Sequence, residues 1–301
     1  RVVQQDLETY AREMAAVGEP LRWAEADELK RRLGTSFFSR ALWQPGGALM
    51  NPAALVRGLA DSLPENVTLC EGTPVTTLAA DNGIVATTPG GSARAPKLVL
   101  AVNGFAREFG FYTRRLVLTA ISASVTRPLS EAEQRLLGED SDWGLLPARG
   151  LAGTTLRYTR DRRIVHRNRI TFNASFRQTP AEMARIERAH RAGFLRRFPQ
   201  LAEVPFTHSW TGHVALARNQ APGFGAIAPG VYAAVCQNGP GVTNGTIAGL
   251  LAADLACGED NPLIALMQRR GTPSLTPPRP FYDLGVKARW LREMWRGRSE
   301  R

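Results

Sequence analysis

The first part of the chain has the spacing of amphipathic helices. It predicts helices over residues 3–18 and 24–33, separated by a Gly-Glu-Pro break that neither helix can cross. A Gly-rich loop follows. Asn51 then occupies the N-cap position of a further helix, with Pro52 as its first residue and leucines every four residues along it. The chain is therefore expected to begin with short helices joined by breaks.

From residue 66 the pattern changes to short strand-like runs. We predict strands over residues 67–70, 75–79, 84–88 and 98–102. The Asp81-Asn82-Gly83 sequence between the second and third runs is a strong hairpin signal. The last run is continuously apolar, as expected of a strand buried on both faces, and it ends at Asn103-Gly104.

The middle of the chain predicts an antiparallel sheet with helices on one side. Strand-like segments cover residues 116–125, 154–158 and 164–176. Ser130 and Glu133 form a capping box for a short helix between them. A second capping box, Thr179 with Glu182, opens a long helix over residues 180–198. This stretch is expected to form a layer separate from the first part of the chain.

The last third predicts a strand, a Gly-rich loop and a helix in direct succession. The strand covers residues 231–236, the loop 237–245 and the helix 246–257, which Gly258 ends. Beyond Pro262 the chain becomes rich in proline and then basic and amphipathic. The alternation of strands and helices predicts an α/β protein with a separate antiparallel layer.

The amino-acid composition limits the classes of partner that the protein is expected to bind. No run of eighteen apolar residues is present, so no membrane span is expected. The net charge is +11, but the 35 arginines and 3 lysines are spread along the chain, which argues against a nucleic-acid-binding module. Two interpretations stay open for the basic tail, residues 289–301: a biased composition, or attraction to acidic partners or a membrane surface.

The three cysteines, Cys70, Cys236 and Cys257, are too few and too scattered for a disulfide framework or a metal site. Each lies in or beside an apolar segment, so we expect small buried hydrophobic side chains. No signal peptide is recognised, and a reduced, cytoplasmic location follows. The chain starts at an amphipathic helix without an initiator Met, so we expect that its natural amino terminus lies upstream.

The Gly-rich loop and the helix after it carry the sharpest chemical signal. A helix start presents free N–H groups and the positive end of a dipole, which suits a phosphate or a developing negative charge on a ring carbonyl. The alternative is that Gly239 and Gly241 only turn a strand tightly into its helix. Residues 223–228 match G-x-G-x-x-A but are not followed by a helix, so they are expected to be a loop and no nucleotide fingerprint.

Few other residues suggest a catalytic or binding role. No metal site is expected, because the four histidines lack the spacing of metal ligands. His190 is expected on the solvated face of its helix. His213 precedes the Gly-rich region and has either a catalytic or a packing role. Arg157 and Tyr158, with Arg163, have the chemistry to clamp a carboxylate, and the alternative is an ordinary surface charge.

These segments, taken in order, resemble the D-amino-acid oxidase-like FAD-dependent oxidoreductases, and within them glycine, sarcosine and γ-glutamylputrescine oxidases. The resemblance covers about residues 40–260 and lies in the order of its pieces. They are Asn51-Pro52, the strand start at 71–75, the strand end at 97–104, Arg157-Tyr158, the Trp-Thr-Gly-His segment at 210–213, the segment 221–225, and the loop and helix at 239–258.

The resemblance implies a mixed α/β fold: a partial FAD-binding Rossmann-like domain interleaved with an antiparallel-sheet substrate domain. The implied boundaries are residues 1–110 for the remainder of the FAD-binding domain together with the entry helices of the substrate domain, 111–212 for the substrate domain, 213–262 for the return to the FAD-binding domain and 263–301 for a basic tail. It places the FAD cofactor against a set of backbone positions: Val75, Ala101, Asn103, Gly104, Gly225, Asn238, Gly239, Gly241, Val242 and Thr243. His213, Tyr158 and Arg157 are the implied catalytic residues.

The implied activity is oxidation of the C–N bond of a small amine or amino acid, with electrons passed to oxygen or another acceptor. The family's amino-terminal G-x-G-x-x-G unit is not found, so we expect a truncated chain that is inactive alone. Two alternatives stay open. One is a quinone-linked dehydrogenase whose basic tail docks on membrane lipid, and the other is a non-catalytic remnant or binding subunit.

Overall fold

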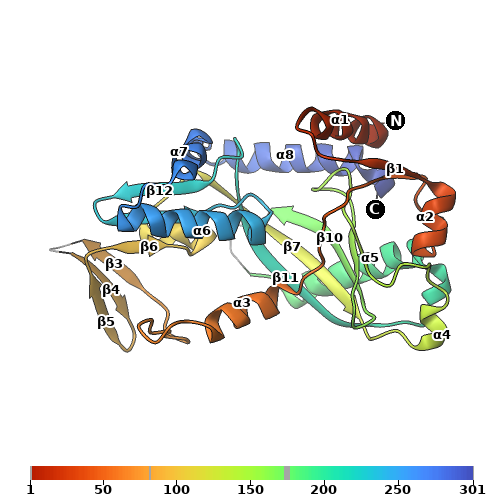
Figure 1. Ribbon diagram of the computed structural model, residues 1–301, viewed down its shortest axis with the longest axis horizontal. Helices are drawn as coiled ribbons and strands as arrows, with labels where there is room; N and C mark the ends of the chain where they lie inside the picture. The colour runs from red at the N-terminus through yellow and green to blue at the C-terminus, as the bar shows by residue number, and fades with distance from the viewer. Residues whose placement is uncertain (1, 81–82, 173–176, 301) are drawn as a thin grey trace. The chain divides into compact units, whose positions relative to one another are not determined.

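The computed structural model describes residues 2–80, 83–172 and 177–300 (Figure 1). The chain forms two compact units. The first unit comprises residues 1–49, 120–212 and 284–301, and the second comprises residues 50–119 and 213–283. The chain passes between the units four times: in the loop at residues 49–50, within the strands β7 and β11, and at residues 283–284 near the start of the last long helix. Within residues 2–80, 83–172 and 177–300, no helix has both the length and the apolar character needed to cross a bilayer.

A five-stranded sheet in the order β11-β7-β10-β9-β8 lies mainly in the first unit. Neighbouring strands β8, β9 and β10 pair antiparallel. From Ile164 to Asn168 of β10, even-numbered residues are buried and odd-numbered ones partly exposed, because successive side chains point to opposite faces. The strands are β7 (Leu116–Thr126), β8 (Trp143–Leu145), β9 (Thr155–Tyr158), β10 (Ile164–Phe172) and β11 (Phe206–Ala217).

The long helix α5 (Pro180–Arg197) contributes to the core of the first unit together with this sheet. Both predicted capping boxes are confirmed, at Thr179 for α5 and at Ser130 for the short helix α4 (Glu131–Gln134). Phe194 and Phe198 are fully buried, and Phe198 stacks on Trp143 with ring centroids 6.1 Å apart. The predicted antiparallel layer with helices is confirmed.

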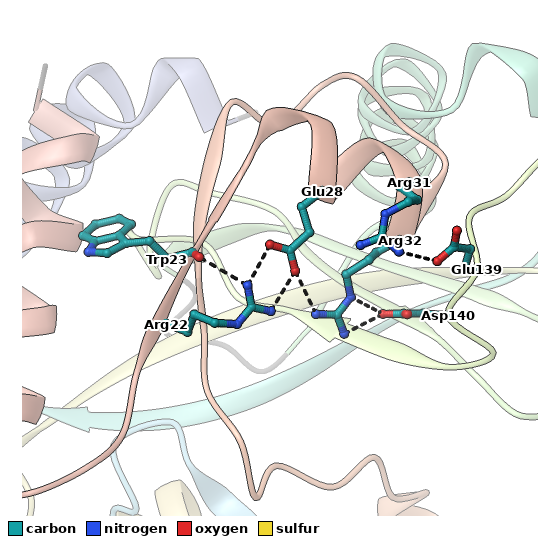
Figure 2. A network of polar contacts seen from close by, with 7 residues as sticks. All are labelled: Arg22, Trp23, Glu28, Arg31, Arg32, Glu139 and Asp140. Carbon is teal, nitrogen blue, oxygen red and sulfur yellow. Dashed lines mark hydrogen bonds and ion pairs between the residues drawn. The ribbon is translucent and has the colours of Figure 1, made fainter.

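The amino-terminal part of the first unit contains a network of ion pairs (Figure 2). Glu28, in helix α2 (Ala26–Leu33), accepts hydrogen bonds from Arg22 at 2.7 Å and from Arg32 at 3.4 Å. Arg32 also pairs with Asp140 at 2.9 Å. These bonds hold the pKa of Glu28 down, to about 2, chiefly through Arg22. The other elements are α1 (Val2–Ala16), β1 (Arg22–Glu25) and β2 (Arg40–Trp43).

The basic carboxy-terminal segment contains a helix, α8 (Phe281–Arg296), followed by the short turn η3 (Arg298–Glu300). From residue 284 onward it belongs to the first unit. Trp290 donates a hydrogen bond from Nε1 to the Ile170 carbonyl at 2.5 Å, and Arg149 pairs with Glu293 at 2.6 Å. The tail is therefore packed against its own unit, and its docking to lipid stays a prediction.

The second unit contains two three-stranded sheets. In the order β12-β13-β6, β13 pairs antiparallel with β12 and parallel with β6, whereas β3-β4-β5 is antiparallel throughout. The strands are β3 (Thr77–Ala80), β4 (Ile84–Thr88), β5 (Gly91–Ala95), β6 (Leu98–Leu100), β12 (Gly223–Ala228) and β13 (Val231–Val235). The helices are α3 (Pro52–Asp61), η1 (Asn103–Phe109), α6 (Gly241–Cys257) and α7 (Pro262–Arg269).

Several strand predictions in this unit are wrong. Residues 67–70 form no strand, and the run at 98–102 is a strand only to Leu100. That strand is not buried on both faces, since Val99 and Val102 are 42% and 39% exposed. The reason is its position at the end of the β12-β13-β6 order. The pairing of β3 with β4 confirms the hairpin partners, although Asp81 and Asn82 lie outside the described residues.

Other predictions were wrong because they concerned strand pairing and burial, which depend on tertiary packing. Residues 223–228 are not a loop but the strand β12, because they pair with β13; no helix follows them directly, as predicted. His190 is fully buried rather than solvated, because its helix turns that face to the sheet. Of the cysteines only Cys236 is buried, whereas Cys70 and Cys257 are exposed.

Candidate functional site

The carboxyl ends of the two parallel strands, β6 and β13, lie at one edge of their sheet. The chain leaves β6 through residues 101–104 and leaves β13 through residues 236–240, directly before helix α6. Ligands of open α/β sheets collect at this position, where loops follow neighbouring parallel strands. The edge therefore brings together two segments that are more than a hundred residues apart in sequence.

Side-chain amides join these segments. The Oδ1 atom of Asn103 accepts a hydrogen bond from the Cys236 backbone N–H at 3.1 Å. Asn238 is bonded more fully, since its Oδ1 accepts from the Ala217 N–H at 2.7 Å. Its Nδ2 donates 3.1 Å bonds to three carbonyl oxygens, those of Gln220, Ala221 and Cys236. Asn238 therefore holds the shape of the turn.

The turn between β13 and α6 has an unusual backbone. Cys236 and Asn238 have φ values of 58° and 56°, and Gly239 has a φ of 112°. Left-handed conformations cost free energy for residues with a Cβ, and Asn tolerates them better than most. At the φ of Gly239 a side chain would be strained, although the space around its Cα is open. Gly239 is thus required by the turn and leaves its backbone approachable.

Strand β13 ends at Val235 and helix α6 starts at Gly241, so the loop covers residues 236–240 and is five residues long rather than the predicted nine. The helix has no side-chain cap and no acidic residue in its first turn. Within the described part of the chain, the backbone N–H groups of Val242 and Thr243 have no hydrogen-bond acceptor. These N–H groups and the positive end of the helix dipole favour a negative charge at this position.

Gln237, which sequence reasoning missed, also belongs to this edge. Its Nε2 donates to the Ala234 carbonyl at 3.1 Å, and its backbone carbonyl accepts from Asn244 Nδ2 at 2.9 Å. Its Oε1 is buried with no hydrogen-bond partner among the described residues. A glutamine between Cys236 and Asn238 has no sequence signal of its own, because its burial depends on the path of the turn.

The FAD-dependent oxidoreductase family named DAO matches this chain over residues 2–255, most of its length. The chain belongs to the DAO family of FAD-dependent oxidoreductases. The resemblance predicted from the ordered segments is therefore confirmed, and so is the mixed α/β fold with antiparallel sheets.

Curated relatives and solved structures agree with this assignment. A probable oxidoreductase OrdL from Rhizobium meliloti is 26% identical over 82% of this chain and 56% of its own length. The γ-glutamylputrescine oxidoreductase of Escherichia coli is 26% identical over 79% of this chain and 55% of its own length. This DAO chain thus spans little more than half the length of these relatives.

Among solved structures, the L-proline dehydrogenase of P. horikoshii has a TM-score of 0.70 at 18% identity, covering 90% of this chain and 75% of that one. The glycine oxidase of Geobacillus kaustophilus has a TM-score of 0.69 at 20% identity, covering 86% and 69%. At sequence identities of 18% and 20%, these structural matches show that the fold is shared and nothing further.

The positions expected to contact the cofactor in this DAO chain are distributed unevenly. Most of them lie at the edge described above: Asn103, Gly104, Asn238, Gly239 and the first turn of α6. Ala101 directly follows β6. Gly225 lies within β12 opposite Ala233, with a φ of 116° and open space at its Cα. Val75 lies in the loop before β3 with an exposed side chain, and no hydrogen bond of the described residues joins it to the edge.

The expected catalytic residues lie in different settings. His213 lies in β11, and burial lowers the pKa of its imidazole, so the ring is neutral at pH 7. Tyr158 is 3% exposed and packs against Trp143 in the core of the first unit. That burial argues against contact with a substrate. Arg157 lies on the opposite face of the same strand and is only partly buried. The catalytic roles of these residues stay predictions.

Proposed function

We propose that this DAO chain forms the flavin-ring side and the substrate layer of an oxidoreductase that oxidises the C–N bond of a small amine or amino acid. The observation that carries the proposal is the uncapped, glycine-flanked start of α6 at the carboxyl ends of parallel β6 and β13. The relationship to a γ-glutamylputrescine oxidoreductase supports the choice of substrate class.

The residues at this edge fit a flavin ring. When bound, FAD supplies the two-electron acceptor for the reaction. The N–H groups of Val242 and Thr243 would hold the ring by donating hydrogen bonds to it, and the α6 dipole would favour negative charge there. Asn103 and Asn238 hold the turn so that these N–H groups need no rearrangement.

The substrate amine must be uncharged at nitrogen to lose a hydride from the neighbouring carbon. We propose that His213 accepts a proton from the ammonium form of the substrate. Burial lowers the pKa of its imidazole, which keeps the ring unprotonated and at the same time makes it a weaker base. The burial of Tyr158 leaves Arg157 as the better candidate for binding the substrate.

The test uses Thr243→Asp in the full-length gene product, with Thr246→Asp as the matched control. Both threonines are exposed, but only Thr243 lies in the first turn of α6. A carboxylate in that turn stabilises the helix by about 0.3–1 kcal/mol and repels a negatively charged ring. We therefore expect Thr243→Asp to raise the unfolding midpoint while weakening FAD binding about tenfold, and Thr246→Asp to leave FAD binding unchanged.

Flavin absorbance and fluorescence quenching measure the binding. Equal affinity for FAD in both variants, or a colourless full-length protein, would contradict the proposal. Release of peroxide when an amine is added separates an oxidase from a dehydrogenase that passes electrons to a quinone.

A further inference from the structure

Helix α8 has an apolar stripe on the side that is turned away from its own unit. Leu284, Leu291 and Trp295 are 62%, 61% and 66% exposed, and Ala288 between them is exposed as well. Their spacing of four, three and four residues puts the four side chains on one face of the helix. Residues 284–295 all belong to the first unit, so the stripe is a feature of that unit alone.

The opposite side of α8 is fixed against the first unit. Met294 is 8% exposed, and Trp290 donates its Nε1 hydrogen bond to the Ile170 carbonyl. A Cβ atom at Gly297, directly after the helix, would lie 2.5 Å from the Cβ atom of Ala152, so the backbone approaches the unit closely there. The helix therefore cannot turn its exposed stripe inward without losing these contacts.

The charged side chains beside the stripe are basic. Lys287 lies on one side of it and Arg292 and Arg296 lie on the other, from the helix geometry of about 3.6 residues per turn. Arg298, in the turn after the helix, holds its guanidinium 5.0 Å from the centre of the Trp295 ring. In the part of the chain that the structure describes, these four cations form no ion pair.

The acidic residues of the same segment are bound on the inner side. Glu293 pairs with Arg149 at 2.6 Å. The carboxylate of Glu300 accepts hydrogen bonds from the backbone N–H groups of Ala148 and Arg149 at 2.8 and 3.0 Å. The segment 284–300 thus turns its carboxylates inward and its cations outward. Together with the net charge of +11, this arrangement attracts an anionic surface.

An apolar stripe bordered by cations is typical of a helix that lies in the interface of a membrane. Leucine and tryptophan enter the boundary between headgroups and acyl chains, while lysine and arginine reach back to anionic headgroups. A second copy of this chain fits the stripe poorly, because a symmetric contact between two α8 helices would bring these cations together. The DAO match ends at residue 255, so α8 lies outside the residues that match the family.

We propose that the exposed stripe of α8, formed by Leu284, Ala288, Leu291 and Trp295, binds the surface of a lipid bilayer that contains anionic headgroups. The helix axis then lies parallel to the membrane plane, the stripe enters the interface, and the cations beside it contact headgroup phosphates. The stripe holds the first unit on the membrane without crossing it. The inference is independent of the amine oxidation proposed above and requires no bound flavin.

The experiment is sedimentation of the full-length protein with vesicles of phosphatidylglycerol and phosphatidylcholine, compared with vesicles of phosphatidylcholine alone. We expect the protein to bind the anionic vesicles and not the neutral ones, and to bind more weakly at high salt, because salt screens the attraction between charges. Leu291→Gln should weaken binding at least about tenfold, because it removes an apolar side chain from the interface.

Leu136→Gln is the matched control for the apolar stripe. Leu136 is 49% exposed in the same unit but lies outside α8, so the affinity of this variant for vesicles should equal that of the parent. If Leu291→Gln binds the anionic vesicles as tightly as the parent does, the inference is overturned.

A second pair of variants separates the cations beside the stripe from the net charge. Arg292→Gln should weaken vesicle binding about fivefold, the effect expected of one cation at an anionic membrane surface. Arg160→Gln removes the same charge from an exposed arginine that pairs with Asp142, and it should leave binding unchanged. Equal losses in the two variants would show that net charge alone attracts the protein to the vesicles, and this would also overturn the inference.

Fluorescence reports whether the stripe itself meets the lipid. Anionic vesicles with brominated acyl chains should quench Trp295, whereas Trp295→Phe should still bind, because phenylalanine is also apolar, and should lose that part of the quenching. Quenching that persists undiminished in Trp295→Phe would contradict the proposed orientation of the helix.

The other possible covers of the stripe give different results. The substituted side chains are exposed, so the thermal unfolding midpoint of Leu291→Gln should equal that of the parent. A lower midpoint would show that the stripe packs within the full-length protein. A parent dimer in light scattering that Leu291→Gln dissociates would show that a second copy covers the stripe. Either result, without binding of the parent to anionic vesicles, would refute the membrane site.

Discussion

A buried histidine makes the stability of the first unit depend on pH. His166 is fully buried in β10, and neither ring nitrogen has a hydrogen-bond partner among the described residues. Its ring lies 5.2 Å from that of His190 and 6.3 Å from that of Phe206. Burial, then the proximity of His190 and Arg197, holds the pKa of His166 well below its ordinary value of 6.5.

The sign of the effect follows from which state binds the proton. Below pH 6.5 the unfolded chain protonates His166, and the folded chain does not, so the free energy of unfolding falls as the pH falls. At pH 5.0 a group that stays neutral in the fold costs about 2 kcal/mol, from about 1.4 kcal/mol per pH unit. Above pH 6.5 both states are neutral, and this contribution vanishes.

The test is His166→Leu, measured by urea unfolding at pH 7.5 and pH 5.0. Leucine has a similar volume, buries no unpaired nitrogen and takes up no proton, so the variant should be at least as stable as the parent at pH 7.5. Its advantage should be about 2 kcal/mol larger at pH 5.0. His208→Leu is the control, because His208 is exposed and its replacement removes a histidine without removing a buried, unpaired imidazole. Parallel pH dependence in the parent and His166→Leu would refute the reasoning.

Two further predictions concern the ends of helices. Gly239→Ala should weaken flavin binding and destabilise the second unit by about 1–2 kcal/mol, because a side chain is strained at a φ of 112°. Gly249→Ala lies inside α6 and should instead stabilise that unit by about 0.5–1 kcal/mol, because alanine favours a helix more than glycine does. Equal shifts in the unfolding midpoints of these two variants would contradict the strain. Thr179→Ala removes the capping box of α5 and should cost about 1 kcal/mol in urea unfolding, and Thr179→Ser should restore most of it; a neutral alanine variant would refute the role of the cap.

The features that could be predicted from the chain alone are local. The sequence correctly predicted the helix N-caps at Asn51, Ser130 and Thr179 and the end of α6 at Gly258. Each of these features depends on a few neighbouring residues. The ordered series of segments also identified the DAO family, which the family comparison confirms. No single segment is specific to the family, and the order of the segments along the chain is what identified it.

What the tertiary structure decided is which residues meet and which faces are covered. The helical spacing of α5 does not say which side packs on the sheet, so His190 was placed in solvent although it is buried beside Ser124. The exposure of Val99 depends on the position of β6 at the end of its sheet.

Which side chains share a face of β9 and β10 depends in the same way on the register, which sets Arg157 opposite Val165 and Thr155 opposite Arg167. A shift of one residue would turn every side chain of a strand to its other face. Caps and turns are settled by neighbours in sequence, whereas burial, register and the meeting of distant loops are settled by contacts between segments that the linear pattern does not relate.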